Sequence, residues 1–203
     1  MSSNKSDVRS VSRRDILKSL AISAAAGSVL RAIPLEAAEY AHRLVQSEKA
    51  SDAGAYAPKF FNPHQYQTLR KLCQTIIPPD EHGGGAIEAG GPEFIDLLTS
   101  ENNEYQLMLG GGMLWLDSTC ADRYGKTYLD SSPPQQTEIL DLIAYRRNGE
   151  LDESLSQGVA FFALLRNLTV DAYFTSEIGI NDLQYIGNVF MKDFPGCPPL
   201  PEA

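Results

Sequence analysis

The sequence is poor in the side chains that usually build metal and redox sites. It holds three histidines, three cysteines and one tryptophan among 203 residues. No histidine has a second metal ligand three or four residues further along the chain, and no C-x-x-C or haem-attaching C-x-x-C-H motif occurs. The glycine triplets at 83–85 and 110–112 lack the G-x-G-x-x-G order of a dinucleotide site, and a G-x-S-x-G nucleophile motif is missing. These absences disfavour the common catalytic classes.

Strand patterns and long apolar runs are missing as well. Nowhere does a sustained period-2 alternation occur, which disfavours a β-sheet domain. After residue 30 no apolar stretch approaches the ~20 residues that cross a bilayer as a helix. Residues 32–203 carry eleven Lys and Arg against twenty-four Asp and Glu, a net charge of −13. An acidic body repels phosphate backbones, so nucleic-acid binding is disfavoured.

The N-terminal segment combines a basic stretch with a short apolar run. Arg13 and Arg14 stand in the sequence Ser-Arg-Arg-Asp-Ile-Leu-Lys, and residues 19–30 carry no charge. This order is typical of a twin-arginine signal, which exports proteins in the folded state. An ordinary amphipathic helix that contains two arginines is the alternative interpretation. We predict a signal segment at 1–33, and the sequence leaves open whether it is removed.

The remainder predicts a linker followed by one all-α domain. Residues 34–59 read as a linker, helical at first and flexible later, which places His42 outside any site. About 145 residues from 60 to 203 suit a single core. We expect a compact, irregular helical bundle of about five to six helices that ends in an extended Pro-rich tail. Its central helix is expected at 154–175, where apolar residues occur almost all round.

Glycines 110–112 lie inside the helix predicted at 103–124. Each glycine costs roughly 1 kcal/mol relative to alanine in a helix interior. Two explanations offset such a cost: the close approach of another backbone, or a local break in the helix. The sequence favours the first.

The three cysteines fall into two groups. Cys73 and Cys120 lie on apolar helix faces and are interpreted as buried small residues, although they could also pair with each other. Cys197 lies in the proline-rich sequence Phe-Pro-Gly-Cys-Pro-Pro, where little core is available to bury it. It is either an unreactive tail thiol or a candidate for a covalent bond to a partner.

One polar loop is a candidate ligand site. Asp80, Glu81 and His82 precede the glycines at 83–85. They are interpreted either as a contact for a cation or substrate or as a solvated loop. No catalytic, cofactor-binding or metal-binding residue is assigned.

The region from about 60 to 200 resembles the gluconate 2-dehydrogenase subunit 3 family. The resemblance lies in Phe-Asn-Pro-His-Gln at 61–65, Ile-Ile-Pro-Pro-Asp at 76–80, Phe-Ile-Asp at 94–96 and Pro-Gly-Cys-Pro at 195–198. Its most telling part is Thr-Val-Asp-Ala-Tyr-Phe-Thr-Ser-Glu-Ile-Gly at 169–179. The order of these elements along the chain is more specific than any one of them.

The resemblance implies a companion role in a dehydrogenase complex that acts on CH–OH donors. It implies a large partner subunit of the glucose–methanol–choline type that holds FAD, with haem c in a possible third, cytochrome c subunit. It also implies that this chain supplies twin-arginine export to the periplasm, supports the folding of the partner, and is not catalytic by itself. The candidate partner interface is Tyr173, Phe174, Tyr185 and Phe194, and Cys197 is the candidate inter-subunit disulfide.

A function from a different class stays open. The chain would then be a stand-alone periplasmic module that binds or converts a sugar through the loop at 80–91. The sequence names neither the substrate nor the electron acceptor.

Overall fold

The computed structural model describes residues 33–51, 56–81 and 83–185. The predicted signal segment lies outside these ranges except for residue 33, and His82, Phe194 and Cys197 lie outside them too. The described residues form helices and connecting loops without a strand, which confirms the all-α prediction. In chain order the elements are α2 (Leu35–Ser51), α3 (Pro63–Ile76), α4 (Gly91–Ser100), α5 (Asn103–Tyr105), the π-helical turn η1 (Gln106–Gly110), α6 (Gly111–Tyr124), α7 (Pro133–Ile143), α8 (Arg146–Leu151), the 3₁₀ turn η2 (Glu153–Leu155), α9 (Ser156–Phe174) and α10 (Glu177–Asp182).

These elements are more numerous than the five to six helices expected. The helix predicted at 103–124 is divided into α5, η1 and α6, because a wide π-helical turn ends at Gly110. The short elements α8 and η2 lie between α7 and α9. The irregularity therefore comes from breaks within predicted helices and from short pieces that periodicity does not reveal.

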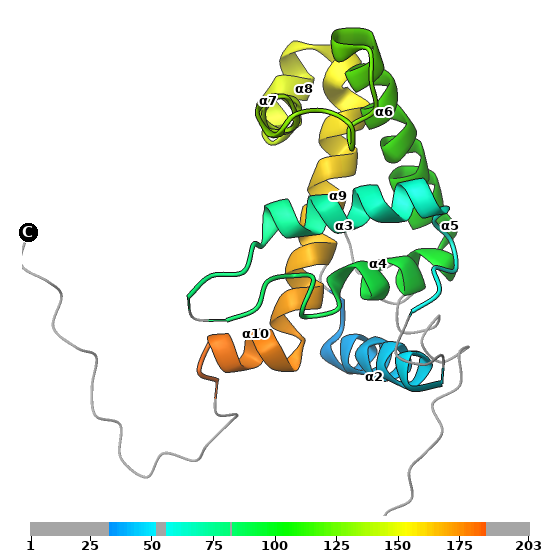
Figure 1. Cartoon of the computed structure of the whole chain (residues 1–203), viewed down its shortest axis with the longest axis vertical. Helices are drawn as coiled ribbons and strands as arrows, with labels where there is room; N and C mark the ends of the chain where they lie inside the picture. The colour runs from blue at the N-terminus through cyan, green and yellow to red at the C-terminus, as the bar shows by residue number, and fades with distance from the viewer. Residues whose placement is uncertain (1–32, 52–55, 82, 186–203) are drawn as a thin grey trace, which may run out of the picture.

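Helix α9 is the centre of the bundle. Figure 1 shows it along the long axis, with α7 and α8 at one end and α2 and α10 at the other. It contacts α3, α4, α6, α7, α8 and α10. Phe161, Leu165 and Leu168 are almost completely buried, and burial of one such side chain stabilises the fold by about 1.5–3 kcal/mol. The prediction of a central helix from its all-round apolar pattern is confirmed.

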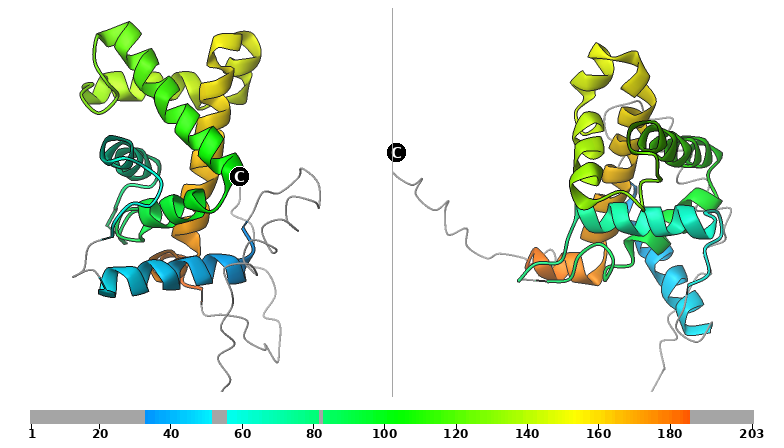
Figure 2. Two further views of the ribbon diagram at one scale, coloured as in Figure 1. Left: turned by 90° about the vertical axis from the view of Figure 1, so that its right-hand side faces the viewer. Right: turned by 45° about the horizontal axis from the view of Figure 1, so that its top comes forward.

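Helices α6 and α9 interlock through two glycines (Figure 2, left). A Cβ on Gly112 would overlap the side chain of Phe161, and a Cβ on Gly158 would overlap the ring of Trp115. Each helix thus offers a notch for a ring of the other. The expected close approach is present, but the neighbour of Gly112 is an aromatic side chain rather than a backbone.

The predicted linker differs from the structure in its first part. Helix α2 packs against α4, and the small side chains Ala37, Ala38, Ala41 and Val45 belong to the core. Alanine spacing of one, three and four residues gives α2 a narrow apolar face that lets it lie close to its neighbours. Residues 35–51 therefore form a helix that packs into the core of the domain and is not only a linker.

The sequence Asn-Pro-His-Gln at 62–65 predicts a capping box at the start of helix α3, and the structure has it. The Gln65 N–H donates to Asn62 Oδ1 over 2.9 Å, and Gln65 Oε1 accepts from the Asn62 N–H over 3.3 Å. With Pro63 in the first turn, this capping box satisfies N–H groups that a helix start leaves without partners. It fixes the beginning of the helix that forms the floor of the groove described below.

Candidate functional site

Asp96 of α4 fastens the segment before α3 to the domain. Its carboxylate is fully buried and accepts four hydrogen bonds. The Tyr56 hydroxyl and the Lys59 N–H donate to Oδ2 over 2.9 and 2.6 Å, and the N–H groups of Phe60 and Phe61 donate to Oδ1 over 3.1 and 3.0 Å. Burial and the neighbouring Asp96 raise the pKa of Tyr56, so its hydroxyl stays a donor. Four donors on one buried charge hold residues 56–61 in a single arrangement.

Glu93, one helical turn before Asp96, joins three helices. Its Oε1 lies 3.0 Å from Lys49 Nζ of α2 and 4.0 Å from the Arg70 guanidinium of α3. The Glu93 side chain is 7% exposed, and its Oε2 has no hydrogen-bond partner among the described residues. Lys49 is the closer cation, so Arg70 is only loosely engaged by Glu93.

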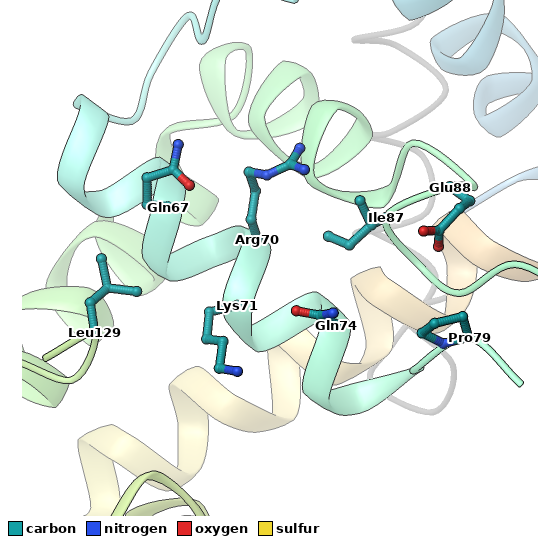
Figure 3. A pocket seen from close by; sticks show the side chains of 8 residues that line it. All are labelled: Gln67, Arg70, Lys71, Gln74, Pro79, Ile87, Glu88 and Leu129. Carbon is teal, nitrogen blue, oxygen red and sulfur yellow. The ribbon is translucent and has the colours of Figure 1, made fainter. Parts of the chain in front are cut away.

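A groove lies on the outer face of α3, and we name it the α3 groove. Its volume is about 300 Å³. Figure 3 shows polar side chains on α3, with Leu129 on one side and Pro79, Ile87 and Glu88 on the other. These three residues belong to the loop between α3 and α4 (77–90), which we call the glycine loop. The lining residues are Gln67, Arg70, Lys71, Gln74, Pro79, Ile87, Glu88 and Leu129.

Both walls of the α3 groove are held by hydrogen bonds. Next to Leu129, the Tyr128 N–H donates to Asp117 Oδ1 over 3.0 Å, and the Gln136 side chain donates to the Tyr128 carbonyl over 2.9 Å. Opposite, the Gly85 N–H donates to Glu88 Oε2 over 2.8 Å. Asp117 Oδ2 also lies 2.7 Å from His64 Nε2, which ties the start of α3 to α6. The groove is therefore a formed feature of the fold.

Asp80 and Glu81, considered from sequence as a ligand contact, are not among the lining residues of this groove. Asp80 Oδ1 accepts a hydrogen bond from the Gly83 N–H over 3.0 Å, so this carboxylate stabilises its own turn. Asp80 and Glu81 are exposed, and His82 lies outside the described residues. The loop contributes Pro79, Ile87 and Glu88 to the lining, which sequence reasoning missed because these residues meet α3 only in three dimensions.

His42 joins α2 to the end of α9. Its Nε2 lies 3.0 Å from Thr175 Oγ1, and that hydroxyl lies 2.6 Å from the Asp171 carbonyl oxygen, to which it donates. The imidazole also packs against Phe94, with ring centroids 4.8 Å apart. Burial lowers the pKa of His42 despite a hydrogen bond to the Ala172 backbone. His42, placed outside any site by the linker prediction, is thus a contact of the domain.

The residues predicted to face a partner differ in how much of each side chain is exposed to solvent. Tyr173 is 5% exposed, Phe174 is 39% exposed and Tyr185 is 55% exposed. The Tyr173 ring meets the edge of Phe174 at 5.1 Å, and its hydroxyl donates to Asp182 over 3.3 Å. Tyr173 therefore supports this surface from beneath, whereas Phe174 and Tyr185 reach it. Phe194 and Cys197 lie outside the described residues, and their roles stay predictions.

Two further apolar side chains belong to the same end of the molecule. Val170 precedes Phe174 by one turn of α9 and is 38% exposed, and Leu183 follows α10 and is 59% exposed. We call Val170, Phe174, Leu183 and Tyr185 the α9–α10 surface. Other large exposed apolar side chains lie on η1, α6 and around α8: Leu107, Leu114, Tyr145 and Leu151.

Helix α10 is firmly attached to α9. The Ser176 hydroxyl donates to the Tyr173 carbonyl over 2.7 Å and accepts from the Gly179 N–H over 3.1 Å. A Cβ on Gly179 would overlap the Tyr173 carbonyl oxygen, so only glycine allows this approach. The sequence Tyr-Phe-Thr-Ser-Glu-Ile-Gly thus fixes the turn that presents the α9–α10 surface.

Cys73 and Cys120 are buried and carry free thiols. Burial raises the pKa of Cys73 to about 12 and also raises that of Cys120. A thiol that stays protonated is a poor nucleophile. The interpretation as buried small residues is confirmed, and the alternative in which the two pair with each other is wrong.

The described residues offer no group of three or more His, Cys, Asp or Glu side chains that could hold a metal ion. Within the same ranges, every helix is too short or too polar to span a bilayer. The fold and the site thus define a small helical domain whose described features are a polar groove, an apolar surface and buried carboxylates that tie helices together.

Comparison with known protein families identifies the family of this chain. Residues 63–196 match the model of the family described as gluconate 2-dehydrogenase subunit 3. The match covers most of the chain, and the chain belongs to this family, as its sequence resemblance predicted. No curated protein matches the chain. No solved structure matches it either.

Proposed function

We propose that this chain is the non-catalytic small subunit of an exported, flavin-dependent sugar or sugar-acid dehydrogenase. The observation that carries the proposal is the family match over residues 63–196, since that family is named for a subunit of a gluconate dehydrogenase. Arg13 and Arg14 before the apolar run at 19–30 support a twin-arginine route to the periplasm. The small subunit carries this signal for a large subunit of the glucose–methanol–choline type and supports its folding and assembly.

The proposed complex keeps its redox groups in other chains. FAD belongs to the large subunit, and haem c belongs to a possible cytochrome c subunit that receives the electrons. The α3 groove does not fit a flavin dinucleotide, because its volume of about 300 Å³ is at the low end even for small-ligand sites. This chain contributes a binding surface for the large subunit, and we assign that contact to the α9–α10 surface.

The α9–α10 surface suits such a contact for two reasons. Phe174 and Tyr185 are large, partly exposed rings, and aromatic side chains are enriched at protein interfaces. The Ser176 and Gly179 contacts hold α10 in place, so the surface is formed before the partner arrives. A preformed surface loses less conformational entropy on binding.

A tagged chain purified from the exported fraction tests the proposal. We expect a larger yellow protein with a flavin absorbance spectrum to co-purify. Replacing Arg13 and Arg14 by lysine is expected to keep both proteins out of the exported fraction. A colourless monomer would contradict the proposal, and sugar binding by that monomer would favour the stand-alone module at the loop 80–91, which borders the α3 groove.

The proposed bond at Cys197 has its own test. Gels run with and without reductant are expected to show a linked pair in the wild type and separate chains in Cys197→Ser. Cys73→Ser is the matched control, because the buried Cys73 thiol is expected to leave the linkage unchanged. A linked pair that persists in Cys197→Ser excludes this cysteine, and a yellow partner without any linkage keeps the function and removes the bond.

A further inference from the structure

The outer face of α3 carries a polar stripe in which, among the described residues, only Arg70 has a side-chain partner elsewhere in the fold. Gln67, Arg70, Lys71 and Gln74 are spaced at i, i+3, i+4 and i+7, so they lie on one side of the helix. The opposite side carries Tyr66, Leu69, Leu72 and Cys73, which are buried in the core. Packing therefore explains the inner face of α3 and leaves the outer face unexplained.

The α3 groove gathers positive charge in an acidic chain. Arg70 hydrogen-bonds the Tyr66 side chain. It lies 4.0 Å from Glu93, whose Oε1 is closer to Lys49 at 3.0 Å, so the remaining guanidinium donors of Arg70 can serve a further anion. No ion pair within the described ranges includes Lys71. Glu88 is the one carboxylate in the lining, and its Oε2 already accepts from the Gly85 N–H. The groove is therefore an attractive place for carboxylates on a molecule whose formal net charge is −9.

The dimensions of the stripe fit an extended peptide. Seven residues of helix rise about 10 Å, which is the length of roughly three residues of extended chain. Gln67 and Gln74 carry amides at the two ends of the stripe, and these can donate to and accept from peptide groups. Pro79, Ile87 and Leu129 provide apolar contact along the walls.

We propose that the α3 groove binds an extended acidic segment of the large subunit, with its carboxylates on Arg70 and Lys71 and its peptide groups on Gln67 and Gln74. This inference rests on the proposed function. It gives this chain a second contact with the large subunit, which is charged and polar, in addition to the apolar contact at the α9–α10 surface.

Charge reversal at Lys71 tests the proposal in the purified complex. Lys71→Glu is expected to weaken binding of the large subunit about tenfold, and Lys71→Gln to weaken it less. Retention of the large subunit in wild type is expected to fall as salt rises, and this dependence is expected to flatten in Lys71→Glu. The matched control is Arg147→Glu on α8, an equal charge change at an exposed side chain outside the groove.

Each outcome of the retention experiment either supports or overturns the groove proposal. Equal retention of the large subunit by Lys71→Glu and Arg147→Glu would overturn the groove proposal while leaving the companion role intact. Lys71 is a surface residue without a described ion pair, so both variants are expected to unfold at the wild-type urea concentration. If Lys71→Glu is less stable than Arg147→Glu, the comparison of Lys71→Gln with wild type decides: unchanged retention overturns the proposal, and weakened retention supports it.

A probe on the full chain separates failure of the groove from failure of the proposed function. Hexaglutamate is expected to shift the amide NMR signals of α3 in the wild type and not in Lys71→Glu, whereas hexalysine is expected to shift neither. This result supports the groove even if no large subunit co-purifies. Shifts with sodium gluconate alone, or no shift with hexaglutamate, would overturn the proposal.

Discussion

At the α6–α9 crossing, aromatic rings fill glycine notches, whereas on α4 two buried carboxylates attach helix α2 and the segment 56–61 to the bundle. Phe161 lies against Gly112 and Trp115 against Gly158, so shape decides the first contact. On α4, Glu93 pairs with Lys49 of α2, and Asp96 accepts hydrogen bonds from the segment 56–61. The comparison teaches that two parts of one bundle are sensitive to different changes. Changes of side-chain volume should destabilise the α6–α9 crossing, whereas changes of charge or pH should act on α4 and the segments attached to it.

Removing the Asp96 carboxylate is expected to have the largest effect. Asp96→Ala leaves the Tyr56 hydroxyl and three backbone N–H groups, one of them buried and the others partly buried, without their acceptor, and we expect a loss of about 3 kcal/mol in the free energy of unfolding. Urea unfolding measures it. The control Asp122→Ala removes an exposed carboxylate of α6 and is expected to change stability by no more than about 0.5 kcal/mol. A loss below about 1 kcal/mol for Asp96→Ala would mean that the Asp96 carboxylate does not govern the attachment of residues 56–61 to α4.

A methyl group in a notch is expected to have the next largest effect. Gly112→Ala forces the Phe161 side chain to move, and we expect a net loss of about 2 kcal/mol, since overpacking outweighs the gain in helix propensity. Gly111→Ala is the matched control, because its Cβ meets only the flexible Gln157 amide at 3.3 Å. The control is expected to be neutral or to stabilise by up to about 1 kcal/mol. Equal effects in urea unfolding would contradict the interlocked crossing.

A change of pH is expected to have the smallest effect and to act on the α2 side. Burial lowers the pKa of His42 below the ordinary 6.5, so the unfolded chain binds the proton more readily than the folded one. Stability from neutral His42 is therefore complete above about pH 6.5 and falls as the pH decreases towards the lowered value. Thermal unfolding between about pH 5.5 and 7.5 measures the slope.

The variant His42→Gln isolates this contribution. It places an amide, which can donate or accept, beside Thr175 and removes the titration, so its stability is expected to depend less on pH in that range. Asp171 acts in the opposite direction at lower pH, since burial raises its pKa above 3.8, which is why the comparison stays above about pH 5.5. A wild-type slope retained in His42→Gln would assign the pH dependence to another group.

Local signals predicted much of this fold. The capping box at Asn62 and Gln65 and the all-round apolar pattern of α9 are properties of neighbouring residues, and the structure has both. The sequence predicts a linker where helix α2 lies, because the core contacts of this helix are mainly alanines, which give a weak periodic signal. The π-helical turn at Gln106–Gly110 has no pattern of its own.

The candidate sites were harder to predict from the sequence. Phe174 and Tyr185 were found through resemblance, and the structure adds the exposed Val170 and Leu183. The α3 groove was missed because its lining comes from α3, the glycine loop and the turn before α7. The sequence shows Asp96 only as part of the Phe-Ile-Asp motif. No local pattern indicates that its hydrogen-bond donors lie about 35–40 residues earlier.

Hydrogen exchange on the purified complex and on the full chain alone tests the companion role most directly. We predict slower exchange in the complex for α3 and for residues 170–185, because these carry the α3 groove and the α9–α10 surface. Exchange in α7 and α8, at the other end of the long axis, is predicted to stay unchanged (Figure 1). Slower exchange confined to α7 and α8, with α3 and residues 170–185 unchanged, would contradict the account.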